Sequence, residues 1–460
     1  MHTLNEAAPD LYARYKKRGS LVSKYETQDQ KYNLSKWSYK ALQNCLYNAY
    51  VDKSRPLLIF GKAGIGKSDV VRQFSEAAAN KEKRTYVVFS DLTNEEKQDV
   101  LKQPEQYFVF WDIRGSQVEP DQVTGIPDLE KAKQQGYLTY SVPEWVYFVT
   151  KPGISGLLFL DEINRSSRAV LNSFLQLTLD RVVSNRKISK NVMIVAAGNL
   201  GSEFSTSTET LDPADIGRFT AGVLVADING WTEYAMKNGI NDYIISFAKA
   251  NPIDNFYKDP ESENSQYVSP RNLKAASRRM DLVIKRYEEA DAKNEDVSED
   301  IYTAIGEAVA GETGPEYANR FIEYIKAIHS FDWAEILQQS DEDKIKEMSI
   351  DQSWALVNFI HDNLLAKYEE ARSKNDKRQE ESVCKEFVTI IKGLPADQLA
   401  FLIKKLKISI LKEHIPGTSL KETAQIFKEF ITTAHNIAKS TNTSIAKKMS
   451  DLIKSMASVN

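Results

Sequence analysis

Residues 57–68 read Leu57-Leu58-Ile59-Phe60-Gly61-Lys62-Ala63-Gly64-Ile65-Gly66-Lys67-Ser68, and this stretch decides the fold expected for the chain of 460 residues. An apolar run of four residues is followed by a glycine-rich turn, and helical spacing continues to about residue 79. A strand, such a turn and a helix in this order form the phosphate-loop pattern, in which backbone N–H groups close around a phosphate. The alternative is a glycine-rich surface turn, which the position between a strand and a helix disfavours.

Further apolar runs typical of buried strands occur at 86–89, 107–111, 157–160 and 192–196. Helical stretches such as 169–179 separate most of them, and another helix is predicted over 36–51. Near-continuous apolar strands that alternate with helices indicate a parallel sheet covered on both faces. The sequence therefore predicts an α/β core over residues 37–228.

The rest of the chain carries a different signal. Residues 1–36 are polar and are expected to form an N-terminal arm, whereas residues 229–330 are predicted to be helical, with a solvated linker at 288–300. Residues 331–460 are also helical and are expected to form a separate C-terminal module, interrupted at turn signals such as Pro416-Gly417. The fold class is thus an α/β core followed by two α-helical regions.

Composition excludes several classes of protein. The 60 Lys and Arg residues nearly balance the 64 Asp and Glu residues, so a globally basic surface that coats nucleic acid or membrane is not expected. The two cysteines, Cys45 and Cys384, are far apart, which excludes a disulfide scaffold and fits a reducing compartment. Because the sequence contains neither a signal peptide nor a run of about 18 apolar residues, a cytoplasmic protein without membrane contact is expected.

Two further strands end in polar side chains. The run 157–160 leads into Asp161 and Glu162, and a strand end beside the phosphate loop would place Asp161 next to Mg²⁺ and Glu162 next to the attacking water. A solvated strand end is the alternative. The run 192–198 ends at Asn199, which would point at the γ-phosphate if its strand lies next to the phosphate-loop strand. An asparagine that only caps the strand is the alternative there.

Two arginines lie farther along the chain, Arg218 before Phe219 and Arg271 in Ser269-Pro270-Arg271. Most surface arginines form only weak ion pairs. A guanidinium aimed at a γ-phosphate, in contrast, is worth ~10³-fold or more in rate.

The order of these five motifs resembles the AAA+ ATPases, and within them Asp161-Glu162-Ile163-Asn164-Arg165 is similar to the MoxR and dynein-related group. The resemblance covers about residues 37–330. It implies ATP and Mg²⁺ as cofactors, Asp161 and Glu162 as Walker B residues, Asn199 as sensor 1, Arg271 as sensor 2 and Arg218 as the finger that reaches the neighbouring subunit's nucleotide. It also implies that ATP contacts Gly61, Lys62, Ala63, Gly64, Ile65, Gly66, Lys67, Ser68 and Asp69, and that Ser68 and Asp161 hold the Mg²⁺.

Three looser matches accompany this resemblance. The segments 117–127 and 136–145 are similar to a Thr-Gly loop and to a hairpin that projects toward the central pore in the group, with an ordinary surface loop as the alternative. Residues 181–190 would form a short hairpin before sensor 1. One position departs from the pattern, because Gly217 stands before Arg218 where the family usually carries an aspartate.

A lysine-rich helix is expected in the C-terminal module. Leu399, Leu402, Ile403, Leu406 and Ile410 form a helical stripe flanked by Lys404, Lys405, Lys407 and Lys412. Membrane or nucleic-acid binding would be one use of such a helix. We favour the simpler interpretation that the stripe packs onto neighbouring helices and the lysines face solvent.

These inferences lead to one leading hypothesis and two alternatives. The leading one is an ATP hydrolase that assembles as a ring homo-oligomer, expected to be a hexamer, and remodels or matures a protein complex. The resemblance implies a von Willebrand factor A domain protein as a partner. The alternatives are a DNA-acting translocase or helicase loader, and a nucleotide-binding scaffold with little turnover.

Overall fold

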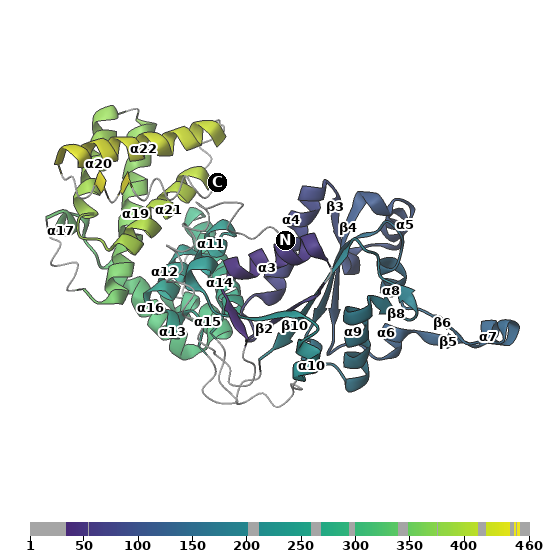
Figure 1. Cartoon of the computed structure of the whole chain (residues 1–460). Coiled ribbons are helices and arrows are strands. Elements are labelled where there is room, and N and C mark those ends of the chain that lie inside the picture. The colour runs from purple at the N-terminus through teal and green to yellow at the C-terminus, as the bar shows by residue number, and fades with distance from the viewer. Residues whose placement is uncertain are drawn as a thin grey trace, which may run out of the picture. The chain divides into compact units, whose positions relative to one another are not determined.

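The computed structural model describes residues 34–53, 55–200, 211–258, 268–293, 300–338, 348–374, 376–412, 420–441, 446–447 and 449–450. The chain divides into two compact units, Met1–Gly230 and Trp231–Asn460, which are drawn in purple to teal and in teal to yellow (Figure 1). The arm expected over residues 1–36 falls almost entirely outside the described residues.

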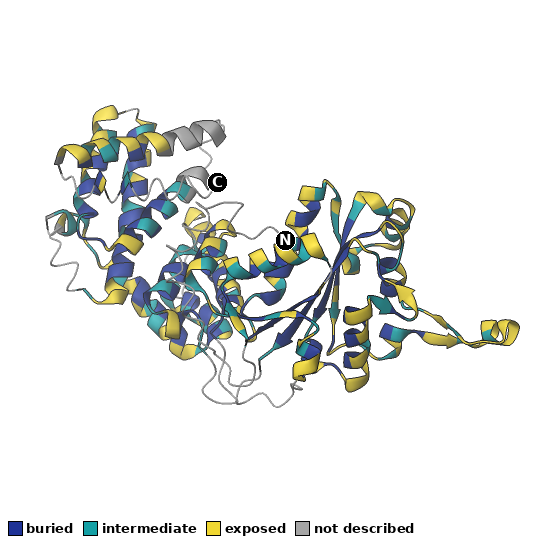
Figure 2. Cartoon of the chain, in the orientation of Figure 1, coloured by how far each residue is buried: buried dark blue, intermediate teal, exposed yellow. Residues whose placement is uncertain are grey.

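A seven-stranded sheet forms the centre of the first unit, with the strand order β1-β11-β2-β10-β7-β4-β3. Every pairing in this sheet is parallel. The strands are β1 Ser35–Trp37, β2 Leu57–Gly61, β3 Thr85–Val88, β4 Tyr107–Arg114, β7 Ser155–Asp161, β10 Val192–Asn199 and β11 Thr220–Leu224. The central strands are buried along nearly their whole length (Figure 2), as their apolar sequences predict.

Helices connect these strands, as a parallel sheet requires. They include α3 Tyr39–Asp52, α4 Lys67–Glu82, α5 Asn94–Lys102, α8 Glu144–Val149, α9 Arg168–Asp180 and the short α10 Pro213–Ile216. The helix α11 Ile228–Lys237 follows the last strand. This arrangement confirms the predicted α/β fold class with helices after the core. The boundaries at residues 36, 228 and 330 stay predictions.

Two short strands, β1 and β11, were not expected from the sequence. Strands β1 and β11 pair with each other, and the helix predicted from residue 36 begins instead at Tyr39, because the Ser38 side chain accepts a hydrogen bond from the Ala41 N–H and caps it. Each strand is only three to five residues long. Strands this short give too little alternation to be distinguished from loops.

A narrow arm extends from the rest of the first unit (Figure 1). It consists of β5 Ile126–Asp128, α7 Leu129–Gln135 and β6 Thr139–Ser141, and its two strands pair antiparallel. The arm follows the four-residue helix α6 Asp121–Thr124. The predicted hairpin is therefore present, but its first strand comes from 126–128 rather than from within 136–145.

The second unit is helical throughout its described residues apart from a single bridge between Lys258 and Val268. After α11 come α12 Asp242–Ala250, α13 Pro252–Asn255, α14 Pro270–Ala292, α15 Ile301–Thr313, α16 Pro315–His329 and α17 Trp333–Gln338. Then follow α19 Ile350–Ser373, α20 Lys377–Ile390, α21 Ala396–Lys412 and α22 Leu420–Thr441. The linker expected over 288–300 is wrong for its first residues, because α14 continues to Ala292 and buries Ala290.

The apolar stripe of α21 packs inward as predicted, since Leu399, Leu402, Ile403 and Leu406 are buried; the side chain of Ile410 lies outside the described residues. The expectation that the lysines face solvent is wrong for Lys405, which is only 2% exposed. Hydrophobic spacing could not reveal this, because its polar partners lie on other helices.

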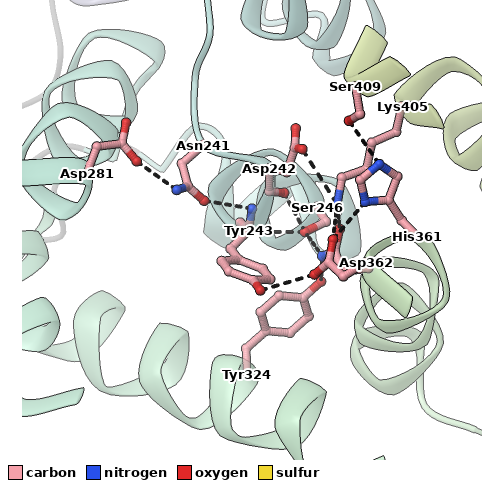
Figure 3. A network of polar contacts seen from close by, with 11 residues as sticks. Asn241, Asp242, Tyr243, Ser246, Asp281, Tyr324, His361, Asp362, Lys405 and Ser409 are labelled. Carbon is pink, nitrogen blue, oxygen red and sulfur yellow. Dashed lines mark hydrogen bonds and ion pairs between the residues drawn. The ribbon is translucent and has the colours of Figure 1, made fainter. Parts of the chain in front are cut away.

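Lys405 is the centre of a polar network that joins α12, α19 and α21 (Figure 3). Its ammonium donates to Asn358 Oδ1 at 2.9 Å and lies 3.6 Å from Asp242 Oδ2 and 3.5 Å from Asp362 Oδ1. A buried cation requires such partners, because desolvation without them costs several kcal/mol. The network therefore ties the two helical regions on either side of residue 330 to each other.

His361 lies in the same network. Its Nδ1 is 2.7 Å from Asp362 Oδ1, and its Nε2 is 3.0 Å from Ser409 Oγ. Burial and the neighbouring Lys405 ammonium lower the pKa of His361, so the ring is neutral at neutral pH.

None of the described helices is both long enough and apolar enough to span a lipid bilayer.

Replacing Lys405 with Met should lower the free energy of unfolding of the second unit by about 1–3 kcal/mol, because Asn358 Oδ1 and two carboxylates lose the cation that they contact. The loss is limited because both carboxylates remain partly exposed to solvent. Lys404→Met on the same helix is the control, because Lys404 pairs with Glu233 at 3.1 Å on the surface and should change stability by less than about 1 kcal/mol. Urea denaturation followed by circular dichroism measures both. Equal losses would contradict the role given to the buried network.

Candidate phosphate-loop site

The loop between β2 and α4 has the backbone shape of an anion cradle. Gly64 and Gly66 have φ values of 73° and 97°, in the left-handed region that favours glycine, and Gly66 caps the start of α4. The first N–H groups of a helix have no partner within the helix and carry its positive dipole end. On the other side of the loop, the Tyr39 hydroxyl donates to the Ile65 carbonyl at 2.7 Å. The loop is thus fixed by its glycines and by a side chain from α3.

Lys67, the first residue of α4, points back into this loop and is 7% exposed. Its ammonium donates to the carbonyls of Gly61 at 2.9 Å and Lys62 at 3.0 Å, and to Asn199 Oδ1 at 2.8 Å. This contact exists because β10 pairs directly with β2, with Asn199 opposite Gly61. The prediction for Asn199 required that its strand lie next to the phosphate-loop strand. The pairing of β10 with β2 meets this requirement.

Ser68 and Asp161 also meet at this edge of the sheet. The Ser68 hydroxyl donates to Asp161 Oδ2 at 2.8 Å. Asp112 on β4 lies nearby, and its pKa is raised by burial and by the Asp161 charge. A divalent cation would relieve the repulsion between these two carboxylates, which gives the region a preference for positive charge.

Glu162 follows Asp161 and adopts a left-handed backbone with φ 52°, a conformation that costs a non-glycine residue free energy and is found at functional sites. Its Oε2 accepts a hydrogen bond of 2.5 Å from the Ser116 hydroxyl, and its Oε1 lies 3.3 Å from an Arg165 nitrogen. Partial burial works to raise the pKa of Glu162, but the Ser116 hydrogen bond and the Arg165 charge outweigh it and hold the pKa below its ordinary value. The carboxylate is therefore ionised at neutral pH.

Asn164 holds the end of β10 in place. It is 2% exposed, its Oδ1 accepts from the Asn199 N–H at 3.0 Å, and its amide donates to the Asn199 carbonyl at 2.8 Å. It lies in the short 3-10 helix Ile163–Arg165 directly after Glu162. One side chain therefore connects the turn that carries Glu162 with the residue that contacts Lys67.

Of the two predicted arginines, Arg218 belongs to the first unit and Arg271 to the second. Arg218 follows α10, is one-third exposed, and has a side-chain nitrogen 3.9 Å from Asp215 Oδ1. Arg271 is exposed in the first turn of α14 in the second unit. The structure thus brings Lys67 into contact with Asn199 and Ser68 into contact with Asp161, with Glu162 adjoining, and Arg218 takes no part in these contacts. The roles of all these residues, of the exposed Asp69 and of the other loop residues stay predictions.

The short hairpin expected over 181–190 is present as β8 Val182–Val183 and β9 Arg186–Lys187, paired antiparallel. At its turn, the Ser184 hydroxyl donates to the Thr124 carbonyl at 2.5 Å. Thr124 is the last residue of α6, directly before the arm. The hairpin and the root of the arm are therefore in contact.

These strand ends, the glycine turn and the helix that follows it decide the fold. It is a parallel α/β core with a P-loop between β2 and α4. The chain then continues into α-helical regions, as the sequence predicts.

No protein-family model matches the sequence, and no curated protein sequence matches it. Among solved structures, C. elegans PCH-2 is 15% identical with a TM-score of 0.26, covering 64% of this chain and 70% of that chain. Brucella abortus NtrX in complex with ADP is 15% identical with a TM-score of 0.31, covering 91% and 73%. The Thermotoga maritima RuvB Holliday junction branch migration motor is 12% identical with a TM-score of 0.27, covering 65% and 74%. Likeness at these TM-scores adds no argument, so the fold assignment rests on the strand order and the loop.

Sequence reasoning did not find three residues that shape the site: Tyr39, Ser116 and Asn164. Tyr39 and Ser116 come from segments without a motif, so only the fold brings them to the loop and to Glu162. Asn164 had a signal, because it stands two residues after Glu162 in a motif already singled out. Its burial, however, could not be foreseen.

Replacing Asn164 with Ala should lower the free energy of unfolding of the first unit by about 1–3 kcal/mol, because two hydrogen bonds to the Asn199 backbone are lost in a buried place. Asn191→Ala is the control, since Asn191 is exposed just before β10. Urea denaturation of the two variants measures the difference. Equal stability of the variants would show that Asn164 does not hold this strand end.

Proposed function

We propose that this protein is an AAA+ ATPase of the MoxR-like group, which hydrolyses Mg²⁺-ATP in a ring oligomer in order to remodel a protein complex in the cytoplasm. One observation carries the proposal. The ends of β2, β10 and β7 meet so that Lys67 contacts Asn199 and Ser68 contacts Asp161, both at 2.8 Å. A phosphate-binding cation, a polar side chain for water and an acidic metal ligand are what phosphoryl transfer to water requires.

The triphosphate of ATP would lie in the loop from Gly61 to Ser68. Its oxygens would accept hydrogen bonds from the N–H groups at the start of α4 and from the Lys67 ammonium, which exchanges carbonyl partners for phosphate oxygens. Exposed Asp69 and Arg271 would complete the binding residues. Asn199 would orient the attacking water while keeping its contact with Lys67.

Mg²⁺ fits the residues present. Among the described residues there is no group of three or more His, Cys, Asp or Glu side chains able to hold a metal by themselves. Mg²⁺ does not need one, because it keeps several waters and uses one or two protein oxygens together with substrate phosphates. The Ser68 hydroxyl and the Asp161 carboxylate supply those oxygens, and the metal would neutralise charge on the phosphates.

Glu162 would accept the proton of the attacking water. Its lowered pKa keeps it ionised, and at present both of its oxygens are engaged by Ser116 and Arg165. A general base must come within hydrogen-bond reach of the water. Each carboxylate oxygen has two lone pairs and here accepts one hydrogen bond, so either oxygen can still accept a hydrogen bond from the water.

The oligomer and its client follow from the same assignment. Arg218 would approach the γ-phosphate held by the adjacent subunit, which makes each site depend on two chains of a hexameric ring. The arm supports a protein client, because its residues Ile126, Leu129 and Tyr137 are exposed by 57%, 65% and 62% and exposed apolar groups mark interaction surfaces. A von Willebrand factor A domain protein is the client class that we propose.

Glu162→Gln should bind ATP as tightly as the wild type while losing at least ~10²-fold in hydrolysis, because the general base is gone and the loop is intact. Lys67→Ala should lose binding itself. Glu105→Gln, an exposed carboxylate of the same unit, is the control and should hydrolyse normally. Phosphate release and equilibrium ATP binding measure these outcomes; wild-type hydrolysis by Glu162→Gln would refute the proposal, and a wild type that binds ATP without turnover would indicate a scaffold.

Ser116→Ala should raise the pKa of Glu162, because the ionised carboxylate loses a hydrogen bond. The acid limb of the kcat/KM profile should then shift to higher pH, so that activity at pH 5.5 relative to pH 7.5 falls. Ser90→Ala is the matched control, since the Ser90 hydroxyl donates to Asp91 at 2.9 Å on the surface. An unchanged profile would show that Glu162 is not the titrating base.

A further inference from the structure

Arg55 lies in the short connection between α3 and β2, directly before the strand that leads into the phosphate loop. Its guanidinium donates to the Gly217 carbonyl at 2.5 Å. Gly217 ends the helix α10 and immediately precedes Arg218. An exposed arginine 162 positions earlier in the chain thus contacts the backbone next to Arg218.

The other side of Arg218 is held by the same connection. Phe219 is buried, and the Thr220 N–H donates to the Pro56 carbonyl at 2.9 Å. Thr220 then pairs with Leu57 as β11 joins β2. Arg55 and Pro56 therefore form hydrogen bonds with the backbone on both sides of Arg218, at Gly217 and at Thr220.

These two hydrogen bonds are important for the position of Arg218 because the preceding helix, α10, has only four residues. A single helical turn is not stable by itself, since nucleation costs more than one hydrogen bond returns. The N–H groups of Arg218 and Phe219 donate to its last carbonyls, those of Asp215 and Ile216. The next carbonyl, that of Gly217, accepts the charge-assisted hydrogen bond from Arg55. The ion pair of Arg218 with Asp215, at 3.9 Å, orients the side chain but comes from the same short turn.

We infer that Arg55 is a positioning residue for Arg218: it holds the turn from which Arg218 reaches the nucleotide of the neighbouring subunit. This inference rests on the proposed function. The connection that grips Arg218 also leads through β2 to the phosphate loop of its own subunit. A displacement of the phosphate loop would therefore also move the Arg218 guanidinium, which reaches the nucleotide of the neighbouring subunit.

Arg55→Ala should lower kcat by about threefold to tenfold, the effect of one hydrogen bond, with ATP affinity and oligomer size unchanged. Arg55→Lys should retain more activity because an ammonium can still donate to the Gly217 carbonyl. Arg72→Ala is the control, since Arg72 is an exposed arginine of the same unit whose nitrogen lies 3.9 Å from Asp91. Arg218→Ala should lose ~10³-fold, and adding Arg55→Ala to it should cost nothing further.

Mixed assemblies, made by coexpression, test whether Arg55 acts on the neighbour's site. Lys67→Ala subunits cannot bind ATP but carry an intact Arg55 and Arg218. In an equal mixture with Arg55→Ala subunits, action across the interface predicts about a quarter or more of the wild-type rate, whereas action within one subunit predicts only about half of the Arg55→Ala rate.

The matching mixture of Lys67→Ala with Arg218→Ala separates the two proposals. If it regains about a quarter of wild-type activity while the Arg55→Ala mixture stays at half of its own rate, the positioning role of Arg55 is wrong and the shared site stands. If the Lys67→Ala and Arg218→Ala mixture regains nothing, the shared site of the proposed function is wrong. An Arg55→Ala variant as active as Arg72→Ala would overturn the inference directly.

Discussion

The contact between the Lys67 ammonium and Asn199 depends on the parallel register of β2, β10 and β7, and the whole site depends on the same register. A parallel sheet brings the carboxyl ends of its strands to one edge, and here that edge collects the loop, the Asp161 carboxylate and the Asn199 amide from three separate segments of the chain. A register shift of one residue in β10 would turn Asn199 to the other face of the sheet. Asn164 opposes such a shift because it binds both backbone groups of Asn199.

The sequence predicted this edge well because each of its elements has a strong local signal. The long apolar runs of β2, β7 and β10 lack the periodicity of an amphipathic helix. The glycines between β2 and α4 predict a phosphate loop, because few other backbone conformations place so many glycines between a strand and a helix. It failed where the signal is not local. Strand β1 pairs only with β11, and β11 pairs with both β1 and β2, so their extended form comes from pairing with distant segments. The Ser116 contact with Glu162 likewise joins two segments that only the finished sheet brings together.

In the second unit, too, the sequence predicted the local pattern but not the contacts between distant segments. The helical stripe of α21 was predictable because hydrophobic burial follows a period of 3.6 residues. Lys405 lies beside that stripe, and nothing in its spacing distinguishes it from Lys404, which pairs on the surface. The difference comes from Asp242 on α12 and Asp362 on α19. Once Lys405 is buried, these carboxylates and Asn358 are its necessary partners, because removing one member would leave an uncompensated charge.

Gly125 at the root of the arm has a structural consequence. Its φ is 83°, and a Cβ atom placed there would lie 2.3 Å from the Ser141 carbonyl oxygen, so the two strands approach too closely for any side chain. Any side chain at residue 125 would force β5 and β6 apart where the arm leaves α6, so the pairing of the two strands at that point depends on glycine.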